Sequence, residues 1–335
     1  MAQTIPLIRS AALVPFLRWA QWNRVDLDAI LRAVGLASLP YFPVEQPVSV
    51  IAAGAFCRDL QRREGPDIGC RVVSETSVME LGTFGRLVLG SATPREAMKR
   101  IEYLAPYHNT HEVFAVREEA GYLILRESLT LPLDAETRHI AQQYVATLIR
   151  SICVMAGRHE STFARVELTP HPDFGLDHLR PWLGPHLAPS RTSGLLLAIP
   201  PAVADRPFPA VTRNLPIRPP PEDWMPLRGD GTLTYSARIV MSVLLEDDTA
   251  TIDQLAAASG MSVRSLQRRL GAEGTSFKAL LADIRREIAL RKLSDRNGST
   301  FGEISAILGY SSQSALTRAV RRWTGATPRA FRNTP

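Results

Sequence analysis

The chain has 335 residues and a formal net charge of +6, and 45% of its residues are hydrophobic. That length is long for one domain and natural for two or three. The most apolar run, residues 194–204, is short and interrupted by Pro200 and Pro201, which excludes a membrane span there. The N-terminal residues do not have the pattern of a signal peptide, so we expect a cytoplasmic protein that makes no contact with a membrane.

The first 206 residues alternate between helical and strand patterns. Helical spacing of apolar residues predicts helices between about residues 14 and 73, and Thr93 followed by Pro94 predicts the start of a helix that continues through Leu104. The later segments predict a hairpin, a further helix and two strands, over residues 113–125, 137–156, 164–168 and 195–199. This order predicts an α+β domain.

Four aromatic residues gather around the predicted hairpin: Tyr103, Tyr107, Phe114 and Tyr122. Small-molecule sites are mostly apolar and contain a few polar groups. We therefore expect these four side chains to line an effector pocket. The alternative for any one of them is that it fills the core.

A proline-rich stretch marks the border between two parts of the chain. Its members are Pro207, Pro209, Pro216, Pro219, Pro220, Pro221 and Pro226. Such a stretch cannot continue a helix or a sheet ladder and favours an extended spacer. We therefore expect an effector-binding and candidate dimerisation domain over residues 1–206, a linker over 207–231 and a further domain over 232–335.

The C-terminal part contains one pattern twice, at about residues 252–272 and 301–322. In each copy a short apolar helix is followed by a turn of Gly and a hydrophobic residue, and then by a second helix that opens with Ser. These are the parts of a helix-turn-helix. The expected apolar anchors are Leu255, Leu266 and Leu270 in the first copy and Ile304, Ile307, Leu316 and Val320 in the second.

The segment between the two copies predicts one long helix over residues 277–293. Its apolar residues Phe277, Leu281, Ile284 and Ile288 follow the spacing of a single buried stripe. One long helix can hold the two copies at a fixed distance. The C-terminal domain is therefore expected to be all-α, with two helix-turn-helix units joined by this helix.

The excess positive charge lies entirely in the C-terminal part. From Thr232 onward there are 15 of the 39 Lys and Arg residues and 9 of the 33 Asp and Glu residues, which leaves 24 of each before that position. A module that binds phosphates requires such an excess.

Residues from about 234 to 332 resemble the DNA-binding domain of the AraC/XylS transcriptional regulators. The resemblance rests on residues 266–270, 273–277, 308–310, 318–328 and 331–332. Tyr310, Leu316 and Val320 stand where that family usually has Phe, which keeps apolar volume. Residues 81–85 and 92–97, with the elements that follow them, resemble the arabinose-binding-like effector domain of one branch of the same family.

The resemblance implies that the second helix of each copy enters the major groove of DNA. Arg bonds guanine and Gln bonds adenine, so for base reading we expect Arg264, Gln267, Arg268, Gln313, Thr317 and Arg318. For the DNA backbone we expect Ser262, Ser265, Ser312, Ser314, Arg321, Arg322 and Arg332, with plain surface charge as the alternative for the three arginines. The implied partners are operator or promoter double-stranded DNA, a small-molecule effector, RNA polymerase and a second copy of the chain in a homodimer.

No catalytic or metal site can be assembled from the sequence. His108 and His111 form an H-x-x-H pair that lacks the third and fourth ligands of a metal site. Cys57, Cys70 and Cys153 contain no C-x-x-C, and no G-x-S-x-G is present. Three further histidines lie in a proline-rich loop and are expected at the surface: His171, His178 and His186.

These features together predict a ligand-responsive transcriptional regulator, either activator or repressor, that is not an enzyme and needs no cofactor. One alternative is an enzyme that is delivered to DNA and carries its chemistry in residues 1–206. The other is an architectural DNA-binding protein without a ligand.

Overall fold

The computed structural model describes residues 4–41, 43–157, 162–209, 224–247, 249–294, 300–310 and 312–332. It divides into two compact units. The N-terminal unit consists of Pro6–Val34 and Leu39–Arg228, and the C-terminal unit consists of Gly229–Pro335 together with Met1–Ile5 and Gly35–Ser38. Within the C-terminal unit the Ile5 amide donates to Ser236 Oγ at 2.9 Å and the Ser38 amide to Asp247 Oδ1 at 2.7 Å.

Most of the predicted linker falls outside the described residues, because residues 210–223 and their prolines Pro216, Pro219, Pro220 and Pro221 are not among them. The described helices include none with the length and apolar character needed to cross a membrane.

The N-terminal unit is a mixed α/β region, as the alternation of patterns predicts. Its helices are α1 (Val14–Asn23), α2 (Asp28–Ala33), α3 (Val50–Glu64), α4 (Ile68–Arg71), α5 (Ser77–Glu80), α6 (Gly82–Leu89), α7 (Pro94–His108), α8 (Ala135–Met155), α9 (Arg180–Leu183) and α10 (Pro201–Ala204). The predicted start of α7 is confirmed, since the Thr93 hydroxyl accepts the Glu96 amide at 3.3 Å and Pro94 occupies the first turn.

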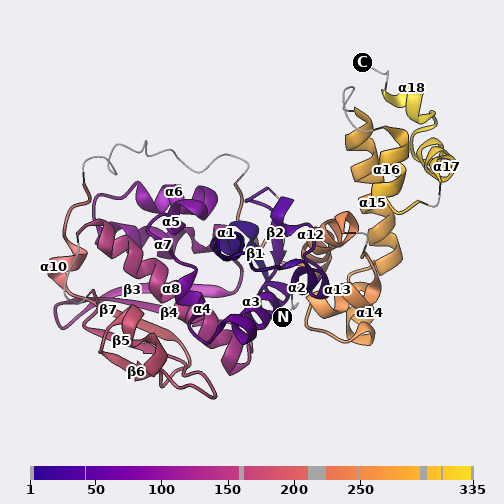
Figure 1. The fold of residues 1–335 in the computed structure, drawn as a ribbon. Coiled ribbons are helices and arrows are strands. Elements are labelled where there is room, and N and C mark those ends of the chain that lie inside the picture. The colour runs from indigo at the N-terminus through magenta and orange to yellow at the C-terminus, as the bar shows by residue number, and fades with distance from the viewer. Residues whose placement is uncertain are drawn as a thin grey trace. The chain divides into compact units, whose positions relative to one another are not determined.

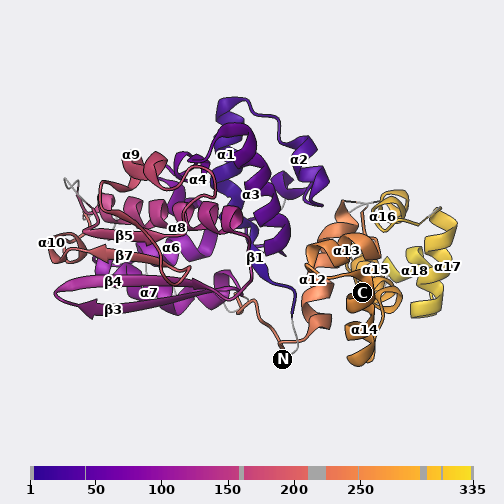
Figure 2. The same cartoon turned by 90° about the horizontal axis from the view of Figure 1, so that it is seen from below.

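Two sheets complete the N-terminal unit. The short strands β1 (Leu7–Arg9) and β2 (Pro47–Ser49) pair antiparallel. The larger sheet has the order β3-β4-β7-β5-β6, and its strands are β3 (Glu112–Glu119), β4 (Tyr122–Leu129), β5 (Arg165–Leu168), β6 (Leu187–Pro189) and β7 (Leu195–Ile199). β5 and β6 are parallel, and the other pairs are antiparallel. Helices α7 and α8 lie along this sheet (Figures 1 and 2).

The predicted hairpin is confirmed. β3 and β4 pair from Glu112 opposite Leu129 to Glu119 opposite Tyr122. The turn between them has positive φ at Ala120 and Gly121, the conformation of a two-residue hairpin turn. The strand that opens this hairpin begins four residues after the end of α7, so the connection from helix to sheet is tight.

The C-terminal unit is helical. Its helices are α12 (Leu233–Glu246), α13 (Ile252–Ala258), α14 (Val263–Ala272), α15 (Phe277–Ser294), α16 (Phe301–Ile307), α17 (Gln313–Thr324) and α18 (Pro328–Arg332). Figure 1 shows α15 as a long column, with α12, α13 and α14 at one end and α16, α17 and α18 at the other.

The buried stripe of α15 differs from the predicted one. Leu280, Ile284 and Ile288 are buried, followed by Ala289 and Leu293, whereas Phe277 and Leu281 are only half-buried. α15 packs against α12 along one part and against α17 and α18 along another. The apolar face therefore moves around the helix and does not follow a single stripe.

Candidate DNA-binding surface and interior cavity

The turns of the two helix pairs α13–α14 and α16–α17 are built alike. Gly260 and Gly309 adopt φ of +62° and +63°, which Gly reaches without steric cost. The same backbone hydrogen bond closes each turn: the Met261 amide donates to the Ala256 carbonyl and the Tyr310 amide donates to the Ser305 carbonyl, both at 3.0 Å. The repeat found in the sequence is therefore also a repeat of backbone geometry.

One residue distinguishes the two turns. Met261 is followed directly by Ser262, the residue before α14, whereas Ser311 separates Tyr310 from Ser312, the residue before α17. Equivalent positions are consequently 49 residues apart before the turn, as with Ala256 and Ser305, and 50 residues apart after it. This register decides which side chains of α14 and α17 correspond.

Serine hydroxyls cap both second helices. Ser262 Oγ accepts the Ser265 amide at 3.3 Å, and Ser312 Oγ accepts the Ala315 amide at 3.2 Å. The Ser262 hydroxyl also lies 3.0 Å from that of the half-buried Ser265. Both serines thus fix the first turn of a helix whose remaining N–H groups suit an anion such as phosphate.

The outer face of α14 presents Arg264, Gln267 and Arg268, and all three are exposed. They lie at spacings of three and four residues, so they share one helix face. Leu266 and Leu270 are fully buried on the side that faces the rest of the unit. The predicted base-reading side chains of this helix are therefore brought together.

The outer face of α17 is built from smaller side chains. Gln313, Ser314 and Arg318 are exposed, while Thr317 is half-buried and donates its hydroxyl to the Gln313 carbonyl at 3.0 Å. In the 50-residue register Ser314, Thr317 and Arg318 correspond to Arg264, Gln267 and Arg268. Gln313 corresponds instead to Val263, so it lies beside the face that matches the α14 readers.

The three predicted backbone arginines have different surroundings. Arg321 and Arg322 are exposed in the last turns of α17. Arg332 is half-buried, and its guanidinium carbon lies 4.5 Å from the centre of the Phe301 ring. This contact is within the range of a cation–π interaction and gives Arg332 a packing role in the C-terminal unit.

The N-terminal unit contains an apolar cavity of about 130 Å³. Its walls come from α1, α3, α5, α6, α7, α8 and β3, and include Phe16, Val88, Phe114 and Leu148. The polar part of the lining is concentrated at the end of α7 and the start of β3, in His108, Asn109, His111 and Glu112.

The polar end of the cavity carries no charge at neutral pH. Burial lowers the pKa of both His108 and His111 to about 3. Burial, reinforced by the neighbouring Glu127 carboxyl, raises the pKa of Glu112 to about 8. Asn109 holds this turn together, because its Nδ2 donates to Glu112 Oε2 at 2.8 Å and its Oδ1 accepts the Glu112 amide at 2.8 Å.

Only one of the four aromatic residues predicted for the pocket lines this cavity, namely Phe114. For the others the structure corrects the expectation. Tyr103 and Tyr122 are 69% and 39% exposed, and Tyr107 stacks on Trp224. The sequence pattern did not show which side of α7 and of the hairpin faces the interior. His108 and His111 were not predicted as cavity residues, because they were interpreted only as potential metal ligands.

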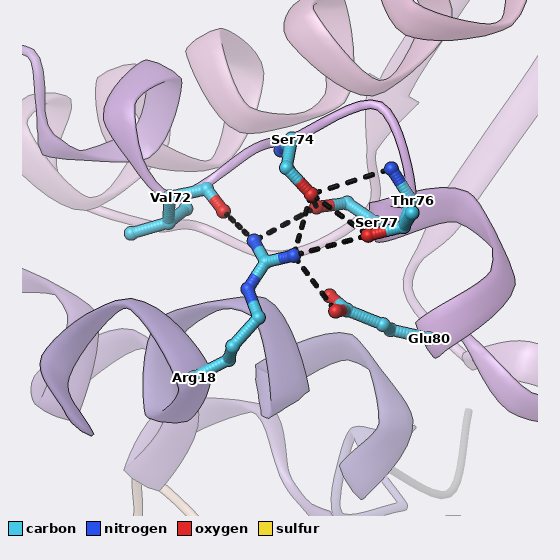
Figure 3. A network of polar contacts seen from close by, with 6 residues as sticks. All are labelled: Arg18, Val72, Ser74, Thr76, Ser77 and Glu80. Carbon is cyan, nitrogen blue, oxygen red and sulfur yellow. Dashed lines mark hydrogen bonds and ion pairs between the residues drawn. The ribbon is translucent and has the colours of Figure 1, made fainter. Parts of the chain in front are cut away.

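One wall of the cavity is fixed by Arg18 of α1 (Figure 3). Its guanidinium donates to the Val72 carbonyl at 2.6 Å and to Glu80 Oε1 at 2.7 Å. Further contacts reach the hydroxyls of Ser74, Thr76 and Ser77. This network holds the segment that carries the lining residues Val78 and Leu81.

Glycine allows α6 to pack on the same segment. A Cβ at Gly85 would lie 1.7 Å from the Val78 carbonyl oxygen, and Gly82 has φ of +64°. The two glycines therefore serve close packing and a turn.

A cluster of histidines lies apart from the cavity. His139 Nδ1 bonds the Thr169 carbonyl at 2.7 Å, and His139 Nε2 lies 3.1 Å from His178 Nε2. His171 is buried beside them, so its expected surface position was wrong, whereas His186 is exposed as expected. Among the described residues no group of three or more His, Cys, Asp or Glu side chains is arranged to hold a metal ion.

The described linker residues that follow residue 223 pack on the N-terminal unit. The indole Nε1 of Trp224 donates to Glu45 Oε2 at 3.0 Å, and Trp224 is 5% exposed. Arg9 lies over the same ring and donates to the Met225 carbonyl at 3.0 Å. The Leu227 amide donates to the Pro106 carbonyl at 3.0 Å. We call Arg9, Glu45, Tyr107 and Trp224 the linker clamp.

Comparisons with known proteins find a match to the C-terminal helices. A family profile described as a helix-turn-helix domain matches residues 255–334. The HTH-type transcriptional regulator VirS of Mycobacterium tuberculosis is 40% identical over 106 residues, which are 32% of this chain and 31% of VirS. The chain thus matches about a third of the length of that relative.

Other relatives align over more of the chain. The ornithine utilization regulator of Pseudomonas aeruginosa is 26% identical over 292 residues, which cover 81% of this chain and 79% of that protein. Among solved structures, the transcriptional regulator CdpR from Pseudomonas aeruginosa covers 96% of this chain and 97% of its own with 16% identity and a TM-score of 0.39. A TM-score this low does not establish a common fold.

The helix pairs, their turns and the regulator-named relatives lead to the same assignment. Residues 255–334 of this chain carry a helix-turn-helix domain, and the C-terminal part of the chain is similar to HTH-type transcriptional regulators.

Proposed function

We propose that this protein is a sequence-specific DNA-binding transcriptional regulator in which α14 and α17 each enter a major groove. The observation that carries the proposal is the pair of exposed helix faces, each with an arginine at the same register position, Arg268 and Arg318. α15 joins the two helix pairs, and the turns that present α14 and α17 share one geometry. Recognition helices on a rigid frame can bind DNA at a fixed spacing.

The base-reading set follows from the register of the repeat. In α14 we propose Arg264, Gln267 and Arg268, whose long side chains can reach base edges. In α17 the main reader is Arg318. Thr317 and Gln313, which were expected beside it, are assigned smaller roles, because the Thr317 hydroxyl is bonded within the helix and Gln313 lies beside the equivalent face.

The DNA backbone is proposed to meet the capped starts of both helices at Ser262 and Ser312, with Ser265 and Ser314 nearby. Exposed Arg321 and Arg322 add positive charge at the end of α17. Arg332 is left out of this set because its guanidinium packs on Phe301. Contacts of this kind position a protein on DNA and give its affinity a strong dependence on salt.

We further propose that residues 1–206 sense a small-molecule effector, that residues 207–231 connect this part to the DNA reader over residues 232–335, and that RNA polymerase and a second copy of the chain are partners. A ligand can change DNA binding only if it binds two conformations or assembly states with different affinities. The apolar cavity, with its uncharged polar end, has the character of such a ligand site.

Footprinting of the full chain tests the two-reader arrangement. An operator would first be selected from random duplex DNA and then probed by hydroxyl radicals in the complex. We expect two protected patches per chain whose centres lie about 34 Å apart, one turn of the duplex. A single contacted groove per chain would contradict the role of α17 as a reader.

A further inference from the structure

We propose that the cavity of the N-terminal unit binds an uncharged molecule of about one aromatic ring that carries a single hydroxyl or carbonyl group, and that His108 and His111 recognise this group. The proposal names the chemical class of the effector, so its consequence for transcription rests on the proposed function. Binding in the cavity itself can be measured without DNA.

The size of the ligand follows from the volume of the cavity. The cavity measures about 130 Å³ and is lined mainly by side chains such as Phe16, Ile101 and Leu148. A dry cavity of about 150 Å³ with such a lining accepts benzene in another protein. A single ring with one or two small substituents is therefore the largest compact ligand that fits without movement of the walls.

The lining offers no counter-ion to an anionic ligand. Among the described lining residues there is no Lys or Arg, and Glu112 is the one carboxyl group. Burial raises the pKa of Glu112 to about 8, so this carboxyl is protonated at neutral pH. A ligand carboxylate would be buried beside it without a partner, which carries a large desolvation cost.

The arginine that acts electrostatically on His108 cannot supply the missing charge. Arg9 acts on His108 electrostatically, but its guanidinium is held in the linker clamp. It donates to the carbonyls of Tyr107 at 2.7 Å, Glu45 at 2.8 Å and Met225 at 3.0 Å. Its position is therefore already determined by the protein.

The hydrogen-bonding group of the ligand follows from the atoms that lack partners. Of the lining side chains, Tyr144 donates its hydroxyl to the Ala12 carbonyl at 2.9 Å, and Thr137 donates its hydroxyl to Asp134 Oδ2 at 2.8 Å. The Nδ1 atoms of His108 and His111 are buried and have no hydrogen-bond partner in the described part of the chain.

Buried polar atoms without partners are rare in folded proteins. A neutral imidazole nitrogen can donate or accept, depending on the tautomer. The two histidines are therefore able to bond a hydroxyl, which does both, or a carbonyl, which accepts. An entirely apolar ligand would leave both Nδ1 atoms unsatisfied.

Three probes that share a methyl-substituted ring test the proposal by calorimetry on the full chain at pH 7: 4-methylphenol, toluene and 4-methylbenzoate. We expect one site for 4-methylphenol, with toluene binding roughly 3- to 10-fold more weakly because it lacks the hydrogen bond. We expect no saturable binding of 4-methylbenzoate. Equal affinity for 4-methylphenol and toluene, or binding of the benzoate at a similar strength, would overturn the proposal.

Substitutions at the two histidines separate recognition from packing. His111→Phe should lower 4-methylphenol affinity to that of toluene and leave toluene binding within about 2-fold, and His108→Phe should act in the same direction. His111→Gln keeps a hydrogen-bonding group and should restore part of the preference. His186→Phe, at an exposed histidine outside the cavity, should change nothing.

Thermal unfolding of each variant without ligand shows whether the variant folds. If a variant does not fold, the comparison of the three probes on the unmodified chain still tests the proposal. Retention of the full preference for 4-methylphenol in both His108→Phe and His111→Phe would overturn the role of these residues.

The same preparations would be tested for binding to the selected operator. A chain that binds operator but not 4-methylphenol contradicts this inference and leaves the regulator function intact. A chain that binds 4-methylphenol with the stated preferences but no duplex DNA supports the ligand class and contradicts the regulator function.

Discussion

The indole of Trp224 stacks on the phenol ring of Tyr107, with ring centroids 5.0 Å apart and planes inclined by 18°. Tyr107 immediately precedes His108, the last residue of α7 and part of the polar end of the cavity. The docked linker and the cavity therefore share one helical turn. We expect a ligand that contacts His108 to change the packing of Trp224, because the positions of both side chains depend on where α7 ends.

Replacement of Trp224 tests this connection. Trp224→Ala removes the ring stacking and the hydrogen bond to Glu45, so the linker end should detach. We expect hydrogen exchange of the Leu227 amide, which bonds the Pro106 carbonyl, to become at least about 10-fold faster. Trp22→Ala, at a residue that is 85% exposed, is the control and should leave this exchange unchanged. Unchanged exchange in Trp224→Ala would mean that the clamp does not hold the linker.

The two arginines that we propose as base readers should have unequal effects when they are replaced. Arg268→Ala and Arg318→Ala are each expected to cost about 1–3 kcal/mol of discrimination between operator and random DNA. Arg318→Ala should lose more of the base discrimination than Arg268→Ala. In α14 the long side chains of Arg264 and Gln267 remain after Arg268 is removed, whereas Arg318 is the main proposed reader of α17.

Competition binding at constant salt measures both effects. Arg329→Ala, at an exposed residue of α18, is the matched control and should reduce affinity for both DNAs alike, if at all. Undiminished discrimination in Arg268→Ala and in Arg318→Ala would contradict the assigned reading face.

Two glycine-to-alanine substitutions should change stability in opposite directions. At Gly85 the new methyl group would collide with the Val78 carbonyl, so α5 and α6 must separate, and we expect a loss of about 1–3 kcal/mol. At Gly271, near the end of α14, a Cβ meets no atom within 4 Å. Gly271→Ala should therefore gain about 0.5–1 kcal/mol from helix propensity. Denaturant unfolding measures both, and equal changes would show that the contact at Gly85 relaxes freely.

Stability of the N-terminal unit should fall as pH rises from 6.5 to 8.5. The pKa of Glu112 is raised to about 8 and that of Glu127 to about 7, so the folded state holds these protons more tightly than the unfolded state and loses this contribution as they dissociate. His108 and His111 have pKa values lowered to about 3, so they reduce stability only below pH 6.5.

Thermal unfolding across this range checks the sign. We expect the melting temperature to fall by roughly 2–8 °C between pH 6.5 and 8.5, and Glu112→Gln, which cannot ionise, should flatten the decline. A melting temperature that stays constant over this interval would show that the buried carboxyls are already ionised in the folded protein.

The C-terminal unit was predictable from sequence because its signals are local. Gly260 and Gly309 mark turns, and Ser262 and Ser312 mark helix starts. Leu266 and Leu270, which follow Ser262, have the spacing of a helix. The error at Leu281 has a different origin. A periodic stripe assumes one packing partner, whereas α15 has different partners at its two ends.

The cavity was not predictable in the same way. Tyr103 and Tyr107 lie on the helix that also supplies Ile101 and His108 to the cavity lining, and only the packing of α3, α6 and α8 decides which side faces inward. Docking of Trp224 depends on Glu45 and Arg9, which are 179 and 215 positions away in the chain. No local sequence pattern predicts a contact between residues so far apart in the chain.

The two helix pairs combine a shared turn geometry with different outer faces. The two helix pairs have the same backbone hydrogen bonds at Met261 and Tyr310. The side chains at equivalent positions of α14 and α17 differ, because Arg264 corresponds to Ser314 and Gln267 corresponds to Thr317. Substitutions on one outer helix face leave the buried leucines and the turn of the other pair untouched. In the proposed arrangement with two reading helices, the base preference of one helix can therefore change while the fold of both helix pairs is kept.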